Sequence, residues 1–319
     1  MVIETTQMPA AQPVGIVAIG KNEGKRLITA LVSAIATRCP VVYVDSGSSD
    51  GSVQAARQLG ASVVELDTKN QKFTAARARN AGLKELISEN PSVEFVQFID
   101  GDCDLRPGWI ERAIDTLRHD KTLAVVCGRR REKFPNASVY NRLCDIEWDT
   151  PVGPADACGG DAMFRRTMLE EVGGYDASLI AGEEPELCRR LAAKGFGILR
   201  IDAEMTHHDA DITSFSQWWK RNVRAGHAFA QVSRKCMTDR GESFWIKNVR
   251  SNYIWAFPPL WLFWPVQWLR MYIKKRDADY ASHLIVSKVP QAIGQLKYNW
   301  NRLVGKESRL IEYKGDVAG

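Results

Sequence analysis

Two acidic clusters stand where an apolar run gives way to a turn. The cluster from Asp100 to Asp104, which begins Asp100-Gly-Asp102, follows the run Phe95–Ile99, and the cluster from Asp45 to Asp50 follows Val41–Val44. Two carboxylates with a Gly between them can bend toward one ligand, and such oxygen donors suit Mg²⁺ or Mn²⁺ held on substrate phosphates. The alternative is a solvated loop in which Asp serves as a turn former.

A pair of glutamates precedes Pro185 at the start of a helical pattern. Since Pro fits the first helical position, we expect Glu184 as the N-cap and Glu183 as the residue before it. The residue before Pro is extended, so Glu184 should project from the helix mouth. The helix dipole there favours the ionised carboxylate that a general base requires. Acidic helix starts are also common without any catalytic role.

Adjacent histidines, His207 and His208, follow the strand-like run Ile198–Ile201. One imidazole could complete a metal shell begun by Asp102. Neighbouring residues on a strand point to opposite faces, so at most one of the two is expected to be a ligand. Surface histidines without a role are the alternative.

A sheet is needed to carry these residues to one edge. Strand-like runs, each followed by turn residues or a helical pattern, predict an α/β fold with a mostly parallel sheet and helices on both faces. Ligands of such sheets bind at the carboxyl ends of strands, where both acidic clusters lie. Asp50 is expected to cap the second helix, and little regularity is seen over 129–150. The expected strands cover 14–20, 41–44, 63–66, 95–99 and 123–127, and the expected helices cover 25–37, 73–87, 109–117 and 215–232.

The stretch Ile254–Leu269 contains no charge, four Trp and three Pro. Its sixteen residues fall short of the roughly 20 that span a bilayer, and its prolines would break a straight helix. With Lys and Arg on both sides, it predicts a membrane-interfacial segment with affinity for anionic lipid. The alternative is a hairpin buried against the rest of the chain.

Composition limits the class of protein. The 319 residues are 45% hydrophobic and 25% charged, which excludes a wholly disordered chain. A net charge of +5 is too mild to favour nucleic acid as a partner. Seven cysteines with no C-x-x-C pair favour neither a disulfide framework nor a zinc site. The N-terminus has no signal-peptide pattern, so we expect a cytoplasmic protein or one peripheral on the cytoplasmic membrane face.

In their order along the chain, these motifs resemble the family 2 glycosyltransferases with a GT-A fold, from Val14 to about Gln231. The resemblance implies a polar leader over 1–13, a GT-A catalytic domain over 14–235 and a C-terminal helical, aromatic-rich extension over 236–319. The stretches that carry it are VAIGKNEGKRL, VVYVDSGSSDGS, ARARNAGL, FIDGDCDLRPGW, GGDAMFRRTMLEEVGGYD, GEEPELCRRL and MTHHDADITSFSQWWKR.

The resemblance implies a metal-dependent, inverting transfer of a sugar to an acceptor hydroxyl on a glycan or a lipid-linked acceptor. The donor would be a UDP-, GDP- or dTDP-sugar. Asp45 would meet the nucleoside, Arg79 would contact the donor and Asp100 would lie near the ribose. Asp102 and His208 would hold Mn²⁺ or Mg²⁺ on the donor diphosphate.

On the acceptor side, the resemblance places Gly160 and Asp161 in a loop and Glu184 as the catalytic base, with Glu183 as the alternative. The base is Glu where Asp is more usual, and Asp104 offers a third acid near the metal. The sequence Gln217-Trp-Trp-Lys-Arg221 only echoes the motif of processive synthases, which favours single addition.

Two other functions remain open at this point. A non-catalytic nucleotide-sugar-binding protein of the same fold should have lost part of the acid set, which is intact here. A sugar nucleotidyltransferase should have a Gly-rich phosphate loop after its first strand. The segment Gly20-Lys-Asn-Glu-Gly24 offers only two glycines, together with an acid.

Overall fold

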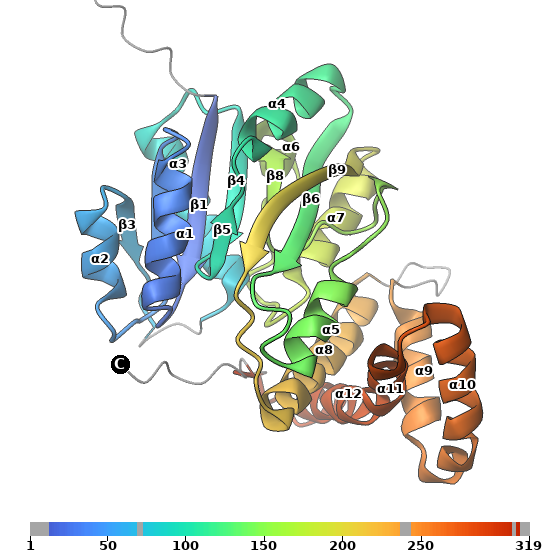
Figure 1. The fold of residues 1–319 in the computed structure, drawn as a ribbon. Helices are drawn as coiled ribbons and strands as arrows, with labels where there is room; N and C mark the ends of the chain where they lie inside the picture. The colour runs from blue at the N-terminus through green and yellow to red at the C-terminus, as the bar shows by residue number, and fades with distance from the viewer. Residues whose placement is uncertain (1–12, 69–72, 237–243, 308–310, 313–319) are drawn as a thin grey trace, which may run out of the picture.

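A computed structural model describes residues 13–68, 73–236, 244–307 and 311–312. Residues 1–12 of the expected leader lie outside this range. The described strands form one sheet in the order β3-β2-β1-β4-β8-β6-β9-β5, and β7 pairs with β9 (Figure 1). The strands are β1 (Val14–Gly20), β2 (Val41–Asp45), β3 (Ser62–Glu65), β4 (Phe95–Asp100), β5 (Cys103–Leu105), β6 (Leu123–Glu132), β7 (Gly153–Pro154), β8 (Ala162–Arg165) and β9 (Gly197–His208).

The longer strands all run in one direction. β1 pairs in parallel with β2 and β4, and β6 pairs in parallel with β9. β8 lies antiparallel between β4 and β6, so β6 and β9 have the same direction as β4. The carboxyl ends of β2, β4, β6 and β9 therefore meet at one edge. This confirms the predicted α/β fold with a mostly parallel sheet.

Helices cover both faces of the sheet (Figure 1). Each buries an apolar stripe: in α4, for example, Trp109, Ala113 and Leu117 recur at four-residue spacing and are buried. In chain order, the helices up to residue 235 are α1 (Lys25–Ile35), α2 (Ser52–Gln58), α3 (Ala75–Glu89), α4 (Trp109–His119), α5 (Val139–Glu147), α6 (Arg166–Glu171), α7 (Glu183–Ala193) and α8 (Phe215–Lys235). The last of these, α8, lies beyond the carboxyl edge of the sheet (Figure 1).

The stretch 129–150 is more regular than its sequence indicates. β6 continues to Glu132, and α5 follows with Ser138 as its N-cap, the Ser138 hydroxyl accepting from the N–H of Asn141 at 3.0 Å. Pairing of β6 with β9 shifts register on both sides of Arg129. These irregularities disturb the alternation of side chains by which a strand is recognised.

The expected cap of the second helix is also displaced. The N-cap of α2 is Gly51, which has a left-handed backbone, rather than Asp50. The carboxylate of Asp50 still accepts from the backbone N–H and the hydroxyl of Ser52, at 3.1 and 2.6 Å.

The C-terminal helices form a layer beside the edge to which β6 and β9 point (Figure 1). They are α9 (Ile246–Ala256), the 3₁₀ helix η1 (Pro258–Phe263), α10 (Trp264–Lys275), α11 (Ala278–Val286) and α12 (Lys288–Leu303). α12 crosses α8 where Gly226 meets Gln291 and Gly294 meets Val223. A Cβ on Gly226 would lie 1.9 Å from the Gln291 carbonyl oxygen, and one on Gly294 2.0 Å from that of Val223. The two backbones therefore touch directly.

Ion pairs and a small core fix these helices to the sheet side of the molecule. Arg142 on α5 binds Asp277 at 2.6 and 3.1 Å and Asp279 at 2.7 Å. The indole of Trp218 on α8 donates to His283 on α11 at 2.9 Å. His283 also contacts Glu147 on α5 at 2.7 Å.

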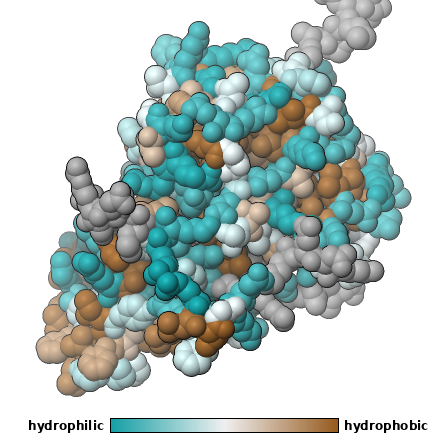
Figure 2. All heavy atoms as spheres, turned by 180° about the vertical axis from the view of Figure 1, so that it is seen from behind, coloured by the Kyte–Doolittle hydropathy of each residue, from teal (hydrophilic) through white to brown (hydrophobic). Residues whose placement is uncertain are grey.

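The segment 254–269 is not buried as a hairpin. Its apolar side chains face outward, and Figure 2 shows hydrophobic residues gathered at this end of the molecule. Within the described part of the chain, every helix is too short or too polar to cross a membrane.

Candidate active site

A pocket of about 370 Å³ opens at the carboxyl edge of the sheet. It receives residues from the ends of β1, β4, β6 and β9, from the loop before β8 and from the starts of α3 and α7. Seven of the residues singled out from the sequence line it: Arg79, Asp100, Asp102, Gly160, Glu183, Glu184 and His208. Asp45 and Asp161 do not line this pocket.

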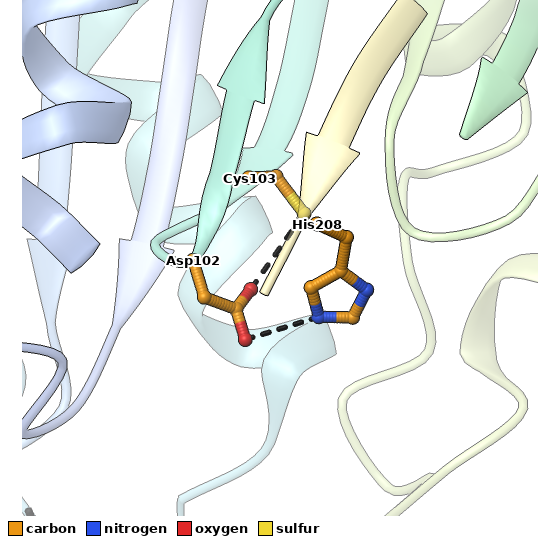
Figure 3. A group of neighbouring side chains, drawn as sticks. All are labelled: Asp102, Cys103 and His208. Carbon is orange, nitrogen blue, oxygen red and sulfur yellow. Dashed lines mark hydrogen bonds and ion pairs between the residues drawn. The ribbon is translucent and has the colours of Figure 1, made fainter. Parts of the chain in front are cut away.

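Asp102 and His208 lie side by side at the ends of two neighbouring strands. β5 and β9 pair so that Cys103 is opposite His208, which places Asp102 beside the end of β9. His208 Nε2 lies 3.1 Å from Asp102 Oδ2, and both side chains are buried (Figure 3). The ligand atoms of Asp102, Cys103 and His208 all lie within 4.8 Å of one another.

These donors fit a divalent ion such as Mn²⁺. Burial and then the charge of Arg130 lower the pKa of His208 to about 4, so its imidazole is neutral at neutral pH, as a metal ligand must be. Its buried Nδ1 has no hydrogen-bond partner among the described residues. Burial raises the pKa of the Cys103 thiol well above its usual value, so Cys103 stays protonated and is a poor ligand.

The other two residues near this pair differ from His208. His207 faces the opposite side of β9, with its Nε2 3.4 Å from Glu204. Asp104 forms an ion pair with Lys133 and does not line the pocket. Neither is placed to join Asp102.

Arg79 joins two predicted site acids that are far apart in the sequence. It lies in α3, and its guanidinium is buried. Nη2 donates to Asp100 Oδ1 and Nη1 to Glu183 Oε1, each at 2.7 Å. Because a buried charge needs partners, this ion triad holds the end of β4 to the first turn of α7.

Arg130 on β6 is a site residue that sequence reasoning missed. Its Nε lies 3.1 Å from Asp161 Oδ2, and its Nη2 lies 3.9 Å from Asp100 Oδ2. The guanidinium also lies over the ring of Trp148, 5.6 Å from its centroid. Trp148, missed as well, stacks on His208 at 4.6 Å. The only sequence signal was the Arg129-Arg130-Arg131 run in the stretch without regular pattern.

Asp161 is fully buried and supports the end of β4. Its Oδ1 accepts from the backbone N–H of Asp100 at 3.0 Å, and its Oδ2 accepts from the Thr206 hydroxyl at 2.7 Å. Together with Arg130, these contacts occupy the carboxylate. The side chain of Asp161 is therefore placed to position neighbours.

Gly160 allows the charged groups to meet. A Cβ at this position would lie 2.9 Å from Arg79 Nη2, 2.9 Å from Asp100 Oδ2 and 3.1 Å from Arg130 Nη2. Any side chain here would have to displace a network of ion pairs. The absence of a side chain at Gly160 therefore leaves room for these ion pairs.

Glu184 lies two helical positions further in than expected. The N-cap of α7 is Gly182, with φ of 78°, so Glu183 and Glu184 are the first two helical residues and Pro185 the third. Pro is accommodated because the N–H groups of a first turn have no intrahelical acceptor. Glu184 Oε1 accepts from the backbone N–H of Gly159 at 3.0 Å.

The pKa of Glu184 is also shifted in the direction opposite to the one expected. Burial and then the neighbouring charge of Glu183 raise the pKa of Glu184 to about 7, despite its place at a helix start. Near neutral pH this carboxyl can both accept and release a proton, as a general base requires.

Asp45 has the contacts of a turn-forming carboxylate. It lies at the end of β2 and is buried. Its Oδ1 accepts from the Tyr43 hydroxyl at 2.9 Å, and its Oδ2 accepts from the N–H groups of Gly47 and Ser48 at 2.9 and 2.8 Å.

Comparison with known proteins agrees with this fold. The model of the family described as Glycosyl transferase family 2 matches residues 16–173. Glycosyltransferase AglE of Haloferax volcanii is 25% identical over 199 residues, which cover 60% of this chain and 63% of that protein. The chain thus spans less than two thirds of this relative's length. Residues 16–173 of the chain belong to glycosyl transferase family 2.

Solved structures confirm the GT-A fold. The mannosyltransferase PcManGT from Pyrobaculum calidifontis, in complex with GDP-Man and Mn²⁺, superposes with a TM-score of 0.65 at 16% identity. The match covers 93% of this chain and 92% of that one. Glucosyl-3-phosphoglycerate synthase from Mycobacterium tuberculosis, with Mn²⁺, UDP and phosphoglyceric acid, gives 0.51 at 15% identity, over 73% and 85% of the chains.

Proposed function

We propose that this protein is a metal-dependent, inverting glycosyltransferase that moves a sugar from a nucleoside diphosphate sugar to an acceptor hydroxyl. The observation that carries the proposal is that one pocket is lined both by the Asp102–His208 pair and by Glu184. The Asp102–His208 pair suits a cation on a diphosphate, and Glu184 suits proton abstraction from a hydroxyl.

On the donor side, Asp102 and His208 would hold Mn²⁺ or Mg²⁺, which when bound neutralises charge on the departing diphosphate. Arg79, Asp100 and Arg130 form the wall beside this pair. We assign Asp100 to contact with the ribose. Arg79 would orient Asp100, since it binds the Asp100 carboxylate at 2.7 Å. Asp45 does not line the pocket, so it would contact the nucleoside only where the nucleoside extends beyond the pocket.

On the acceptor side, Glu184 would take the proton of the acceptor hydroxyl. The acceptor oxygen then forms a bond to the anomeric carbon, while the bond from that carbon to the diphosphate oxygen breaks. Attack opposite to the leaving group inverts the anomeric configuration, as in inverting glycoside hydrolysis. Gly159 orients the base, and Glu183 remains the alternative, although its carboxylate is engaged by Arg79.

Relatives and structural neighbours support the substrate class in the proposal. PcManGT is solved with GDP-Man and Mn²⁺, and the synthase with UDP and Mn²⁺. We propose a UDP-, GDP- or dTDP-sugar as donor and a glycan or lipid-linked acceptor, in glycan, polysaccharide or glycolipid assembly. We propose the cytoplasm or the cytoplasmic membrane face as its location.

The test is a panel of UDP-, GDP- and dTDP-sugars incubated with the protein, with Mn²⁺ and after chelation. Metal-dependent release of nucleoside diphosphate is the expected result, and NMR of the transferred sugar should give the inverted anomer. Donor binding without turnover for every sugar would favour a non-catalytic binding protein. Release of pyrophosphate from a nucleoside triphosphate and sugar phosphate would favour a nucleotidyltransferase.

A further inference from the structure

An exposed apolar surface projects from the C-terminal helices. It consists of Phe257, Trp261, Leu262, Phe263, Val266 and Leu269, which we call the apolar tip. Leu262 is 84% and Val266 64% exposed. Figure 2 shows hydrophobic residues dominating this end of the molecule. Contiguous apolar surface of this kind marks a site of interaction.

The backbone around the apolar tip is built to present it. Pro258 and Pro259 follow α9 and begin η1, and Pro265 occupies the first turn of α10, so the chain turns through a short 3₁₀ helix. The indole N–H of Trp264 donates to the carbonyl of Trp255 at 3.1 Å, which fixes α10 against α9. The apolar tip is therefore held out at the turn between two helices.

Charge around the apolar tip has one sign. Residues 246–276 contain six Lys and Arg and no Asp or Glu. Four of these cations directly follow the tip, and all six are exposed: Lys247, Arg250, Arg270, Lys274, Lys275 and Arg276.

The nearest carboxylates in sequence offset only a small part of this charge. Asp277 and Asp279 begin the next helix, but both are bound by Arg142 on α5. An apolar surface with a cationic border and exposed aromatic rings is complementary to a bilayer with anionic headgroups.

We propose that the apolar tip inserts into the interface of a lipid bilayer, and that the surrounding cations contact anionic headgroups. The tip lies at the turn between α9 and α10, at the end of these helices that points away from the sheet (Figure 1). This proposal goes beyond the proposed location, because it names the surface that binds the membrane and the class of lipid that it contacts. It does not depend on the proposed reaction, because its test measures binding alone.

The test is flotation of the full chain with vesicles of neutral phosphatidylcholine and with vesicles containing about one third phosphatidylglycerol. We expect flotation with the anionic vesicles at low salt and its loss at high salt. The double variant Leu262→Asp/Val266→Asp should lose flotation. The control Val152→Asp changes another exposed apolar residue, 57% exposed, outside the C-terminal helices and should float like the parent.

Charge reversal tests the second half of the proposal. Lys274→Glu/Lys275→Glu should weaken binding to anionic vesicles by about tenfold or more. The matched control Arg118→Glu/Lys121→Glu reverses two exposed cations elsewhere and should bind normally. Equal binding of the parent to neutral and anionic vesicles would overturn the headgroup contact.

Absence of binding to both vesicle types at low salt would overturn the proposal. Sedimentation of the parent as a dimer that Leu262→Asp converts to a monomer, without vesicle binding, would instead assign the apolar tip to a second copy of the chain. Near-ultraviolet circular dichroism of each variant checks that its fold is retained.

Discussion

Glu184 is tied to Gly159 by a hydrogen bond of 3.0 Å from the Gly159 N–H to the Glu184 carboxylate. This contact joins the first turn of α7 to the loop that leads into β8. Gly160, the next residue of that loop, packs against Arg79, Asp100 and the other charged groups of the site. The candidate base and the donor-side charges therefore share one rigid support.

Replacing Glu184 with Gln should keep this hydrogen bond acceptor while removing the base. We expect donor binding to persist and kcat to fall by about 10²–10⁴. Steady-state kinetics and calorimetric binding of the nucleoside diphosphate measure both effects. Glu183→Gln is the matched variant: a large loss there, with little change in Glu184→Gln, would transfer the base role to Glu183.

The pH dependence should report the same group. Since burial and Glu183 raise the pKa of Glu184 to about 7, the base is protonated below this pH and kcat should rise as pH increases through it. The step should disappear in Glu184→Gln. In Glu183→Gln it should move to lower pH, because the neighbouring negative charge is gone. A pH-independent kcat in the parent would contradict the assignment.

The metal pair predicts a difference between adjacent histidines. His208→Ala should raise the Mn²⁺ concentration for half-maximal activity by about tenfold or more, whereas His207→Ala should leave it unchanged. Asp102→Asn should abolish transfer with the fold intact. Mn²⁺ titration of donor turnover measures all three variants. Small and equal effects of both His variants would mean that carboxylates and phosphates alone hold the ion.

The helix crossing makes a prediction about stability. Gly to Ala within a helix normally stabilises by about 0.5–1 kcal/mol. At Gly226 the added methyl would meet the Gln291 carbonyl oxygen, so Gly226→Ala should instead lower the free energy of unfolding by about 1–3 kcal/mol. Ser216→Ala, on an exposed position of the same helix, is the control. Denaturant unfolding that leaves Gly226→Ala as stable as the parent would argue against this close approach.

The sequence located the polar residues at the carboxyl edge of the sheet for a physical reason. Continuous apolar runs mark strands buried on both faces, and polar residues directly after them must lie at the sheet edge. Asp100 and Asp102 were found in this way, whereas His208 was singled out as one of two adjacent histidines beyond a strand-like run. The structure brings all three into the pocket.

The errors have physical causes too. Arg130 and Trp148 come from a stretch where irregular pairing of β6 disturbs alternation, so neither carried a periodic signal. The predicted start of α7 was wrong because Pro is allowed throughout the first helical turn. The N-cap at Gly182 sets where the helix begins. The raised pKa of Glu184 depends on tertiary burial, which no local pattern contains.

The contact of His283 with Glu147 and Trp218 has a consequence for dissecting the enzyme. Arg221 lines the pocket and binds the same Glu147 at 2.8 Å. Burial alone would raise the pKa of Glu147, but Arg221 and His283 lower it to about 2. Ending the chain after α8 would remove His283 and uncover the Trp218 indole. A shortened enzyme or a chimera joined at that point would therefore inherit an altered pocket wall. Exchange of the C-terminal helices between relatives should use junctions that keep α5, α8 and α11 from one parent.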